Sequence, residues 1–129
     1  MTVCGAVTGG TVNMALVILG GIVVTPPTGV DLTTAEGLAA GMPLMQPKHF
    51  LFPFLAHAAG TLVGAWIVAR FAASRQLQLS MIISALFFAG GFQMVMELPS
   101  PMWFNATDLL LAYFPMGWLA YKLGRKSEI

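Results

Sequence analysis

The side chains best able to do chemistry are a few polar residues that lie within long apolar stretches of the sequence. They are His57, Gln93, Glu97, Asp108, Thr61 and Asn13. A histidine gains or loses a proton near neutral pH, and a neighbouring carboxylate can orient its ring or share that proton. Because polar groups among apolar side chains are costly unless they find partners, we expect the first four to converge into one cluster, with Thr61 and Asn13 as further members.

Three interpretations of this cluster stay open. The first is a structural hydrogen-bond network that fixes the order of the helices. The second is a small site that binds a polar ligand or relays protons, with His57 as the titrating group. The third is a metal site, since His49 and His57 lie eight residues apart, on roughly one side of a helix. No metal-ligand spacing accompanies this pair, so we predict no metal and no cofactor.

The composition is that of a membrane protein. Hydrophobic residues make up 57% of the 129 residues and charged residues 9%, against roughly 45–50% and about 25% in soluble domains. A net charge of +1 supplies no basic patch, so nucleic acid is not a predicted partner. Cys4 is the single cysteine, which excludes an internal disulfide and a multi-cysteine metal site.

Three stretches without Asp, Glu, Lys or Arg are each long enough to cross a bilayer, which takes about 20 residues. They predict spans at about 3–25, 50–71 and 79–98. Pro26 and Pro27 end the first and Pro99 the third, because proline lacks the N–H that a helix interior needs. A cleaved signal peptide is the alternative for the first stretch, but no Lys or Arg precedes residue 48, so we expect a retained helix.

A fourth span is predicted at about 102–123. It contains Asp108 and Pro115, but its leucines and aromatic residues have no soluble core to join. Pro115 should kink this helix and free the carbonyl of Leu111.

These spans predict a single transmembrane domain over residues 1–129. We expect an all-α, integral-membrane four-helix bundle of antiparallel up-and-down spans, with one long outer loop at 26–49. Residues 64–71 and 116–123 are similar in sequence, so the bundle is alternatively a pair of duplicated helical hairpins.

The distribution of lysine and arginine predicts the orientation. Five of the six lie in the 70–80 loop and the C-terminal tail: Arg70, Arg75, Lys122, Arg125 and Lys126. The opposite loops hold Lys48 alone. Because lysine and arginine accumulate on the cytoplasmic side, we expect the N-terminus and the C-terminus to be cytoplasmic.

The long outer loop has the pattern of a short helix. Thr33 and Glu36 are spaced as a capping box, in which each side chain satisfies a free backbone N–H. We expect the helix to end near Gly41 and to lie on the membrane surface.

Small residues recur at helical spacing in the first two spans. They are Gly5 and Gly9 in the first, and Ala56, Gly60 and Gly64 in the second. Such stripes let helix backbones approach closely. They predict tight packing inside one bundle or, alternatively, a homodimer face.

Three segments carry a resemblance to a known group of proteins. They are Pro26-Pro27-Thr28-Gly29-Val30-Asp31, then residues 57–65 from His57 to Ala65, and Pro99-Ser100-Pro101-Met102-Trp103-Phe104 followed by Asp108. In these segments the chain resembles short bacterial four-span membrane proteins to which no function is assigned. The resemblance implies four spans in a bacterial inner membrane, and it carries over no activity and no functional residue.

Two functions follow as expectations. The first is a non-enzymatic, multi-pass inner-membrane protein that acts by association in the bilayer, as a self-associated unit or as an accessory subunit of other membrane chains. The alternative is a small oligomeric transporter or channel unit with an outer-half site around His57 and Asp108. A membrane enzyme that acts on lipid or quinone is a minor third possibility. A cavity that reaches His57 would favour transport, and a packed interior would favour association.

Overall fold

The computed structural model describes residues 1–126, and all regular structure in that part of the chain is helical. The expected all-α class is therefore confirmed. The α-helices are α1 (Thr2–Val23), α2 (Ala35–Gly41), α3 (Leu51–Phe71), α4 (Gln76–Glu97), α5 (Met102–Leu111) and α6 (Phe114–Gly124), and two short 3-10 helices precede α3, η1 (Met42–Leu44) and η2 (Pro47–Phe50).

Three helical segments of residues 1–126 are long and apolar enough to cross a membrane: Thr2–Val23, Pro47–Phe71 and Gln76–Glu97. They cover the first three predicted spans. The helix α1 stops before Thr25, because a residue that precedes proline is disfavoured in the helical region. Arg75 adopts a left-handed conformation with φ 55°, and this turn reverses the chain between α3 and α4.

The fourth predicted span is not one helix. The helix α5 has 10 residues and α6 has 11, and Ala112 and Tyr113 separate them. Pro115 lies in the first turn of α6, where its missing N–H is tolerated. The expected kink at Pro115 is thus a complete interruption of the helix. Each half alone is shorter than the roughly 20 residues that a span needs.

The helices α1 and α3 pack through their small residues. A Cβ added to Gly5 would lie 2.6 Å from the carbonyl oxygen of Gly64, and the reverse contact has the same length. Gly9 and Gly60 face each other in the same way, one turn further along. The stripes thus support packing inside one chain, and α3 occupies the surface of α1 that the homodimer alternative would have used.

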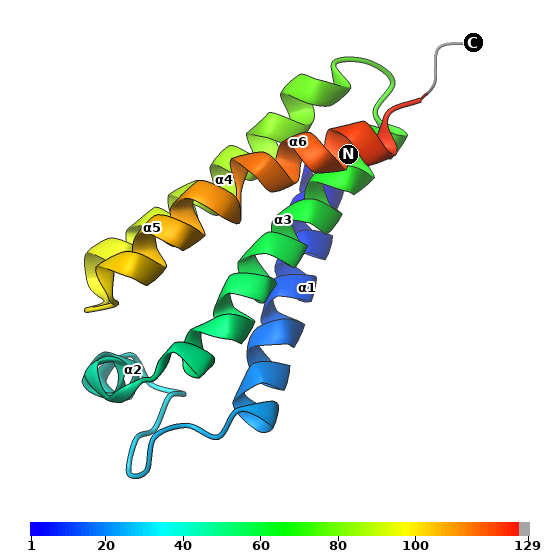
Figure 1. The fold of residues 1–129 in the computed structure, drawn as a ribbon. Coiled ribbons are helices and arrows are strands. Elements are labelled where there is room, and N and C mark those ends of the chain that lie inside the picture. The colour runs from blue at the N-terminus through cyan, green and yellow to red at the C-terminus, as the bar shows by residue number, and fades with distance from the viewer. Residues whose placement is uncertain (127–129) are drawn as a thin grey trace.

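The other side of α3 packs on α4 and α6. The buried core there consists of Ala65, Val68, Ala72, Ile83 and Ala120. Gly124 lies against Ala69 near the end of α3, so the α5–α6 segment runs back along α4 to the end of the molecule where α1 begins (Figure 1). Because both α1 and the α4–α6 layer contact α3, this helix is the centre of the fold.

The outer loop contains the expected short helix, but the expected cap is wrong. The N-cap of α2 is Thr34, whose hydroxyl accepts a hydrogen bond from the Gly37 N–H at 3.0 Å. Thr33 instead donates its N–H and its hydroxyl to the Asp31 carboxylate. The competing Asp31–Thr33 turn explains the one-residue shift of the cap.

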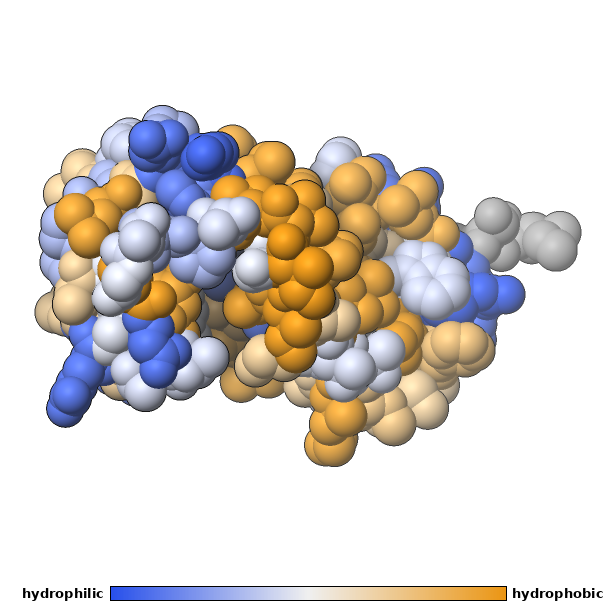
Figure 2. Space-filling model, turned by 90° about the horizontal axis from the view of Figure 1, so that it is seen from below, coloured by the Kyte–Doolittle hydropathy of each residue, from blue (hydrophilic) through white to orange (hydrophobic). Residues whose placement is uncertain are grey.

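Large apolar side chains cover much of the surface. Val3 and Ile22 of α1 are 75% and 74% exposed. Figure 2 shows hydrophobic residues gathered over the middle of the face seen from below, between more hydrophilic atoms at the two ends. This distribution is compatible with a membrane protein, whose middle faces hydrocarbon.

Candidate functional site

The candidate site is centred on Asp108, a carboxylate buried among apolar helices. Its side chain is 3% exposed. It lies one helical turn after Phe104, the other buried residue of α5, so the two share the inner face of this helix. Phe104 packs against Phe50 at 4.7 Å between ring centroids, and this contact holds α5 against the start of α3.

His57 of α3 is the first partner of Asp108. Its Nδ1 lies 2.8 Å from Oδ1 and 2.9 Å from Oδ2, so a proton on Nδ1 is shared by both carboxylate oxygens. The prediction that these two residues meet is confirmed by this geometry. A hydrogen bond in which the donor or the acceptor is ionised is about twice as strong as a neutral one.

Tyr113 is the second partner of Asp108, and sequence reasoning missed it. Its hydroxyl donates to Oδ2 at 3.0 Å, and its ring stacks on His57 with centroids 5.8 Å apart and planes 26° apart. Residues five apart in a continuous helix point roughly 140° apart. The break between α5 and α6 removes that constraint and lets Tyr113 turn back towards Asp108. We call His57, Asp108 and Tyr113 the polar triad.

A glycine of α4 makes room for the tyrosine. A Cβ at Gly91 would overlap the Tyr113 hydroxyl, and Tyr113 is 1% exposed. A buried tyrosine hydroxyl needs a partner. The nearby Pro115 and the Gly90-Gly91 pair were the available sequence signals for this contact.

The other expected members of the cluster lie elsewhere. Gln93 donates to Glu97 at 2.9 Å on the exposed surface of α4, so their convergence with His57 was wrong. Thr61 donates to the His57 carbonyl at 2.8 Å, which satisfies its hydroxyl inside α3. Asn13 faces Gly60 across the α1–α3 contact, and its buried Oδ1 has no hydrogen-bond partner among residues 1–126.

His49 is excluded from the site by its own contacts. Its Nδ1 accepts the Gln46 N–H at 2.8 Å, and its Nε2 lies 3.0 Å from the Thr25 carbonyl, so it ties the outer loop to the end of α1. Among residues 1–126, no group of three or more His, Cys, Asp or Glu side chains lies close enough together to hold a metal ion.

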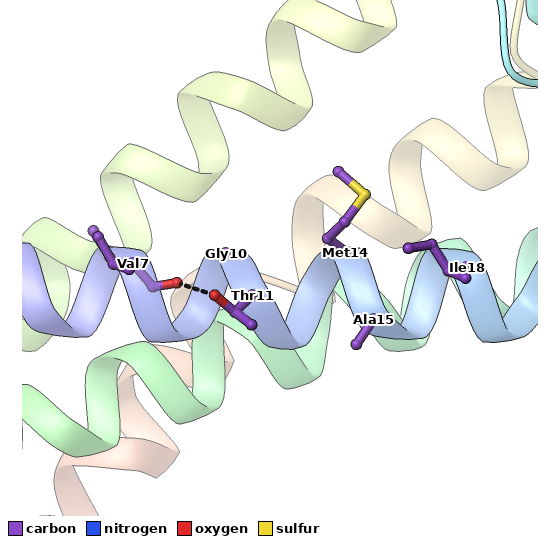
Figure 3. Close-up of a pocket in the computed structure, with 7 residues that line it drawn as sticks. Val7, Gly10, Thr11, Met14, Ala15 and Ile18 are labelled. Atoms are coloured by element: carbon purple, nitrogen blue, oxygen red, sulfur yellow. Dashed lines mark hydrogen bonds between the residues drawn. The ribbon is translucent and has the colours of Figure 1, made fainter.

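Two hollows lie on the surface, away from the polar triad. One hollow, of about 500 Å³, runs along the exposed side of α1, and Figure 3 shows its lining residues. We call this surface the open face of α1; it consists of Ala6, Val7, Gly10, Thr11, Met14, Ala15 and Ile18. The other, of about 440 Å³, lies at the turn between α3 and α4. Neither hollow is lined by His57 or Asp108.

Comparisons with protein-family models, with curated proteins and with solved structures found no match. The function therefore has to be inferred from the geometry of this chain. Three features carry chemical or binding potential: the polar triad, the open face of α1 and the hollow at the turn between α3 and α4.

Proposed function

We propose that the protein acts by association within a membrane, as a self-associated unit or as an accessory subunit of a membrane complex. The observation that carries the proposal is the open face of α1, where Val7, Met14 and Ile18 are exposed and Gly10 has no close neighbour within residues 1–126.

The glycines of α1 support this proposal. Gly9 and Gly20 each face a close neighbour in α3, whereas a Cβ at Gly10 or Gly21 would meet no atom of the described residues within 4 Å. A glycine inside a helix costs about 1 kcal/mol relative to alanine. Since eleven residues make close to three turns, Gly10 and Gly21 lie on one side of α1. A partner helix that packs closely there would account for both glycines.

The polarity of the open face also suits a helix partner. The Thr11 hydroxyl donates to the Val7 carbonyl of its own helix at 2.9 Å. The face therefore presents small and apolar groups with no unsatisfied side-chain donor, and association would rest on close packing.

A matched pair of substitutions tests association. We expect the purified protein in lipid nanodiscs to carry a second copy or a distinct membrane chain in native mass spectrometry. Gly10→Leu should release that chain. Gly90→Leu is the control, because Gly90 is an equally open glycine on α4. A monomer in the unaltered protein, or equal release by both variants, would contradict the proposal.

For the membrane arrangement, we propose four spans, with α5 and α6 together forming the fourth. Residues 102–124 are about 35 Å long at 1.5 Å per residue, enough for a hydrocarbon core of about 30 Å. The position of Gly124 beside Ala69 supports a return crossing.

We further propose a bacterial inner membrane with both termini in the cytoplasm, on the basis of the lysine and arginine distribution and the resemblance. Cysteine labelling in intact cells tests the orientation. A cysteine at Gly29 should react with an impermeant reagent, and one at Gln76 should not. The reverse pattern would overturn the orientation.

A further inference from the structure

The hollow at the turn between α3 and α4 brings together residues from two distant parts of the sequence. We call it the turn hollow. It has a volume of about 440 Å³ and is lined by residues 73–78, by Tyr121 of α6 and by Lys126 beyond the end of α6. Arg75 belongs to the first of these segments. Two basic side chains, 51 residues apart like the His57–Asp108 pair, therefore border one space.

The two cations of the turn hollow have no acidic partner in the described chain. Among residues 1–126, no carboxylate forms an ion pair with Arg75 or Lys126, and no acidic residue lines the hollow. Both side chains are exposed, and arginine and lysine beside water carry a positive charge at neutral pH. Because like charges that face one space repel each other, an anion between them would be stabilised.

A third cation lies beside the turn hollow. The guanidinium carbon of Arg125 lies 5.9 Å from the centroid of the Tyr121 ring, and Tyr121 lines the hollow. Lys122 differs, because its ammonium lies 5.1 Å from the centroid of the Trp118 ring and neither of these residues lines the hollow. The positive charges at this end of the molecule thus divide into a group at the hollow and others outside it.

The start of α4 adds backbone donors to these charges. Residues 76–78 line the hollow, and no side chain among residues 1–126 caps this helix start. The first helical hydrogen bond of α4 is donated by Leu79 to the Arg75 carbonyl, so the N–H groups of residues 76–78 precede it. Such free N–H groups bind phosphate oxygens, and the helix dipole favours negative charge there. They complement the cations and do not select a ligand by themselves.

The position of the hollow favours a lipid over a soluble anion. It lies where α3 ends, at Phe71, and α4 begins, at Gln76, and both helices are long and apolar enough to cross a membrane. A turn that joins two such helices lies at the level of the lipid headgroups. Leu77 lines the hollow and is 41% exposed, and Phe71 is 59% exposed. Apolar surface for an acyl chain therefore lies next to the basic hollow.

We propose that the turn hollow binds the phosphate group of an anionic phospholipid. Arg75 and Lys126 hold the phosphate oxygens, and the acyl chains lie along the apolar side chains of α3 and α4. A choline headgroup carries a positive charge that these cations repel, so a headgroup with a net negative charge is preferred. The proposal goes beyond association, and none of its residues belongs to the open face of α1.

Two matched double substitutions test the site. The site pair is Arg75→Gln/Lys126→Gln, and the control pair is Arg70→Gln/Lys122→Gln. Each pair removes two positive charges from exposed positions at the same end of the molecule, but only the residues of the site pair line the hollow. The full chain is placed in nanodiscs of phosphatidylcholine and phosphatidylglycerol with identical acyl chains. Native mass spectrometry then counts the lipids that stay bound to the released protein.

We expect the unaltered protein to retain phosphatidylglycerol in preference to phosphatidylcholine. The site pair should reduce this preference about tenfold or more, and the control pair by less than about threefold. Arg75→Lys/Lys126→Arg keeps both charges and should keep the preference, which separates loss of charge from an effect on folding. Equal reductions by the site and control pairs would overturn the proposal, and so would the absence of any preference in the unaltered protein.

Inorganic phosphate is the probe for a soluble ligand. It is added to the protein in nanodiscs of phosphatidylcholine alone, and its ³¹P NMR line width is measured. We expect no broadening by the protein, because the lipid supplies the apolar contacts that hold the headgroup in place. Broadening that the site pair abolishes and the control pair keeps would make a soluble phosphate the ligand, and it would overturn the assignment to a lipid.

Discussion

Replacing His57 with phenylalanine should destabilise the protein more than replacing Asp108 with leucine. Asp108 is 3% exposed and His57 is 24% exposed. Without His57, the buried carboxylate keeps only the Tyr113 hydroxyl, and breaking such a buried pair costs about 3–5 kcal/mol. Without Asp108, the imidazole keeps an accessible edge, but the hydroxyl of the buried Tyr113 loses its acceptor, so we expect a loss of about 1–3 kcal/mol.

The double variant His57→Phe/Asp108→Leu should be milder than His57→Phe alone. Replacing both partners with apolar side chains removes the buried carboxylate, so the remaining cost is that of the Tyr113 hydroxyl without its acceptor, about 1–3 kcal/mol. The two changes should therefore couple by about 3 kcal/mol, well above the roughly 0.5 kcal/mol scatter of independent sites. Tyr113→Phe extends the cycle: it removes the other donor and should cost about 1 kcal/mol by itself.

The assay is reversible unfolding in mixed micelles, followed by far-ultraviolet circular dichroism as the fraction of dodecyl sulfate rises. The free energy of unfolding is compared among the unaltered protein, the two single variants and the double variant. Additive losses would refute the coupling between His57 and Asp108. A larger loss in Asp108→Leu than in His57→Phe would refute the reasoning from burial.

Two further predictions concern other parts of the chain. Gly91→Ala should lower the free energy of unfolding by about 1–3 kcal/mol, because its methyl group would displace the Tyr113 hydroxyl. Gly90→Ala, in open space, should raise it by about 0.5–1 kcal/mol; shifts of the same sign would contradict this contrast. Hydrogen bonds from the Thr33 hydroxyl and N–H hold the pKa of Asp31 below its ordinary 3.8, so this interaction is complete above that pH and is lost as the pH falls through the lowered pKa. Thr33→Ala should move the pKa back up in a carboxyl ¹³C NMR titration, and an unchanged titration would count against the turn.

The sequence was sufficient to predict α1, α3 and α4 and their approximate ends. Long runs without charges and the prolines at 26, 27 and 99 act locally, so they predicted α1, α3 and α4 without knowledge of the packing. The stripes predicted close helix packing, because backbones approach closely only where side chains are small, but that Gly5 and Gly9 pair with the second stripe of the same chain was seen only in the structure. The cap of α2 was misplaced by one residue, because Asp31 competes for Thr33.

Tertiary structure alone decided which polar residues meet. A helix that is apolar all round carries no stripe that marks its inner face, so the sequence gives the depth of His57, Gln93 and Asp108 but not the direction in which each points. Packing turned Gln93 to the surface. The interruption of the last predicted span at Ala112 and Tyr113 brought Tyr113 onto Asp108, from a position that a continuous helix would have pointed elsewhere. Rotation about a helix axis is set by contacts with neighbouring helices, and those contacts exist only in the folded chain.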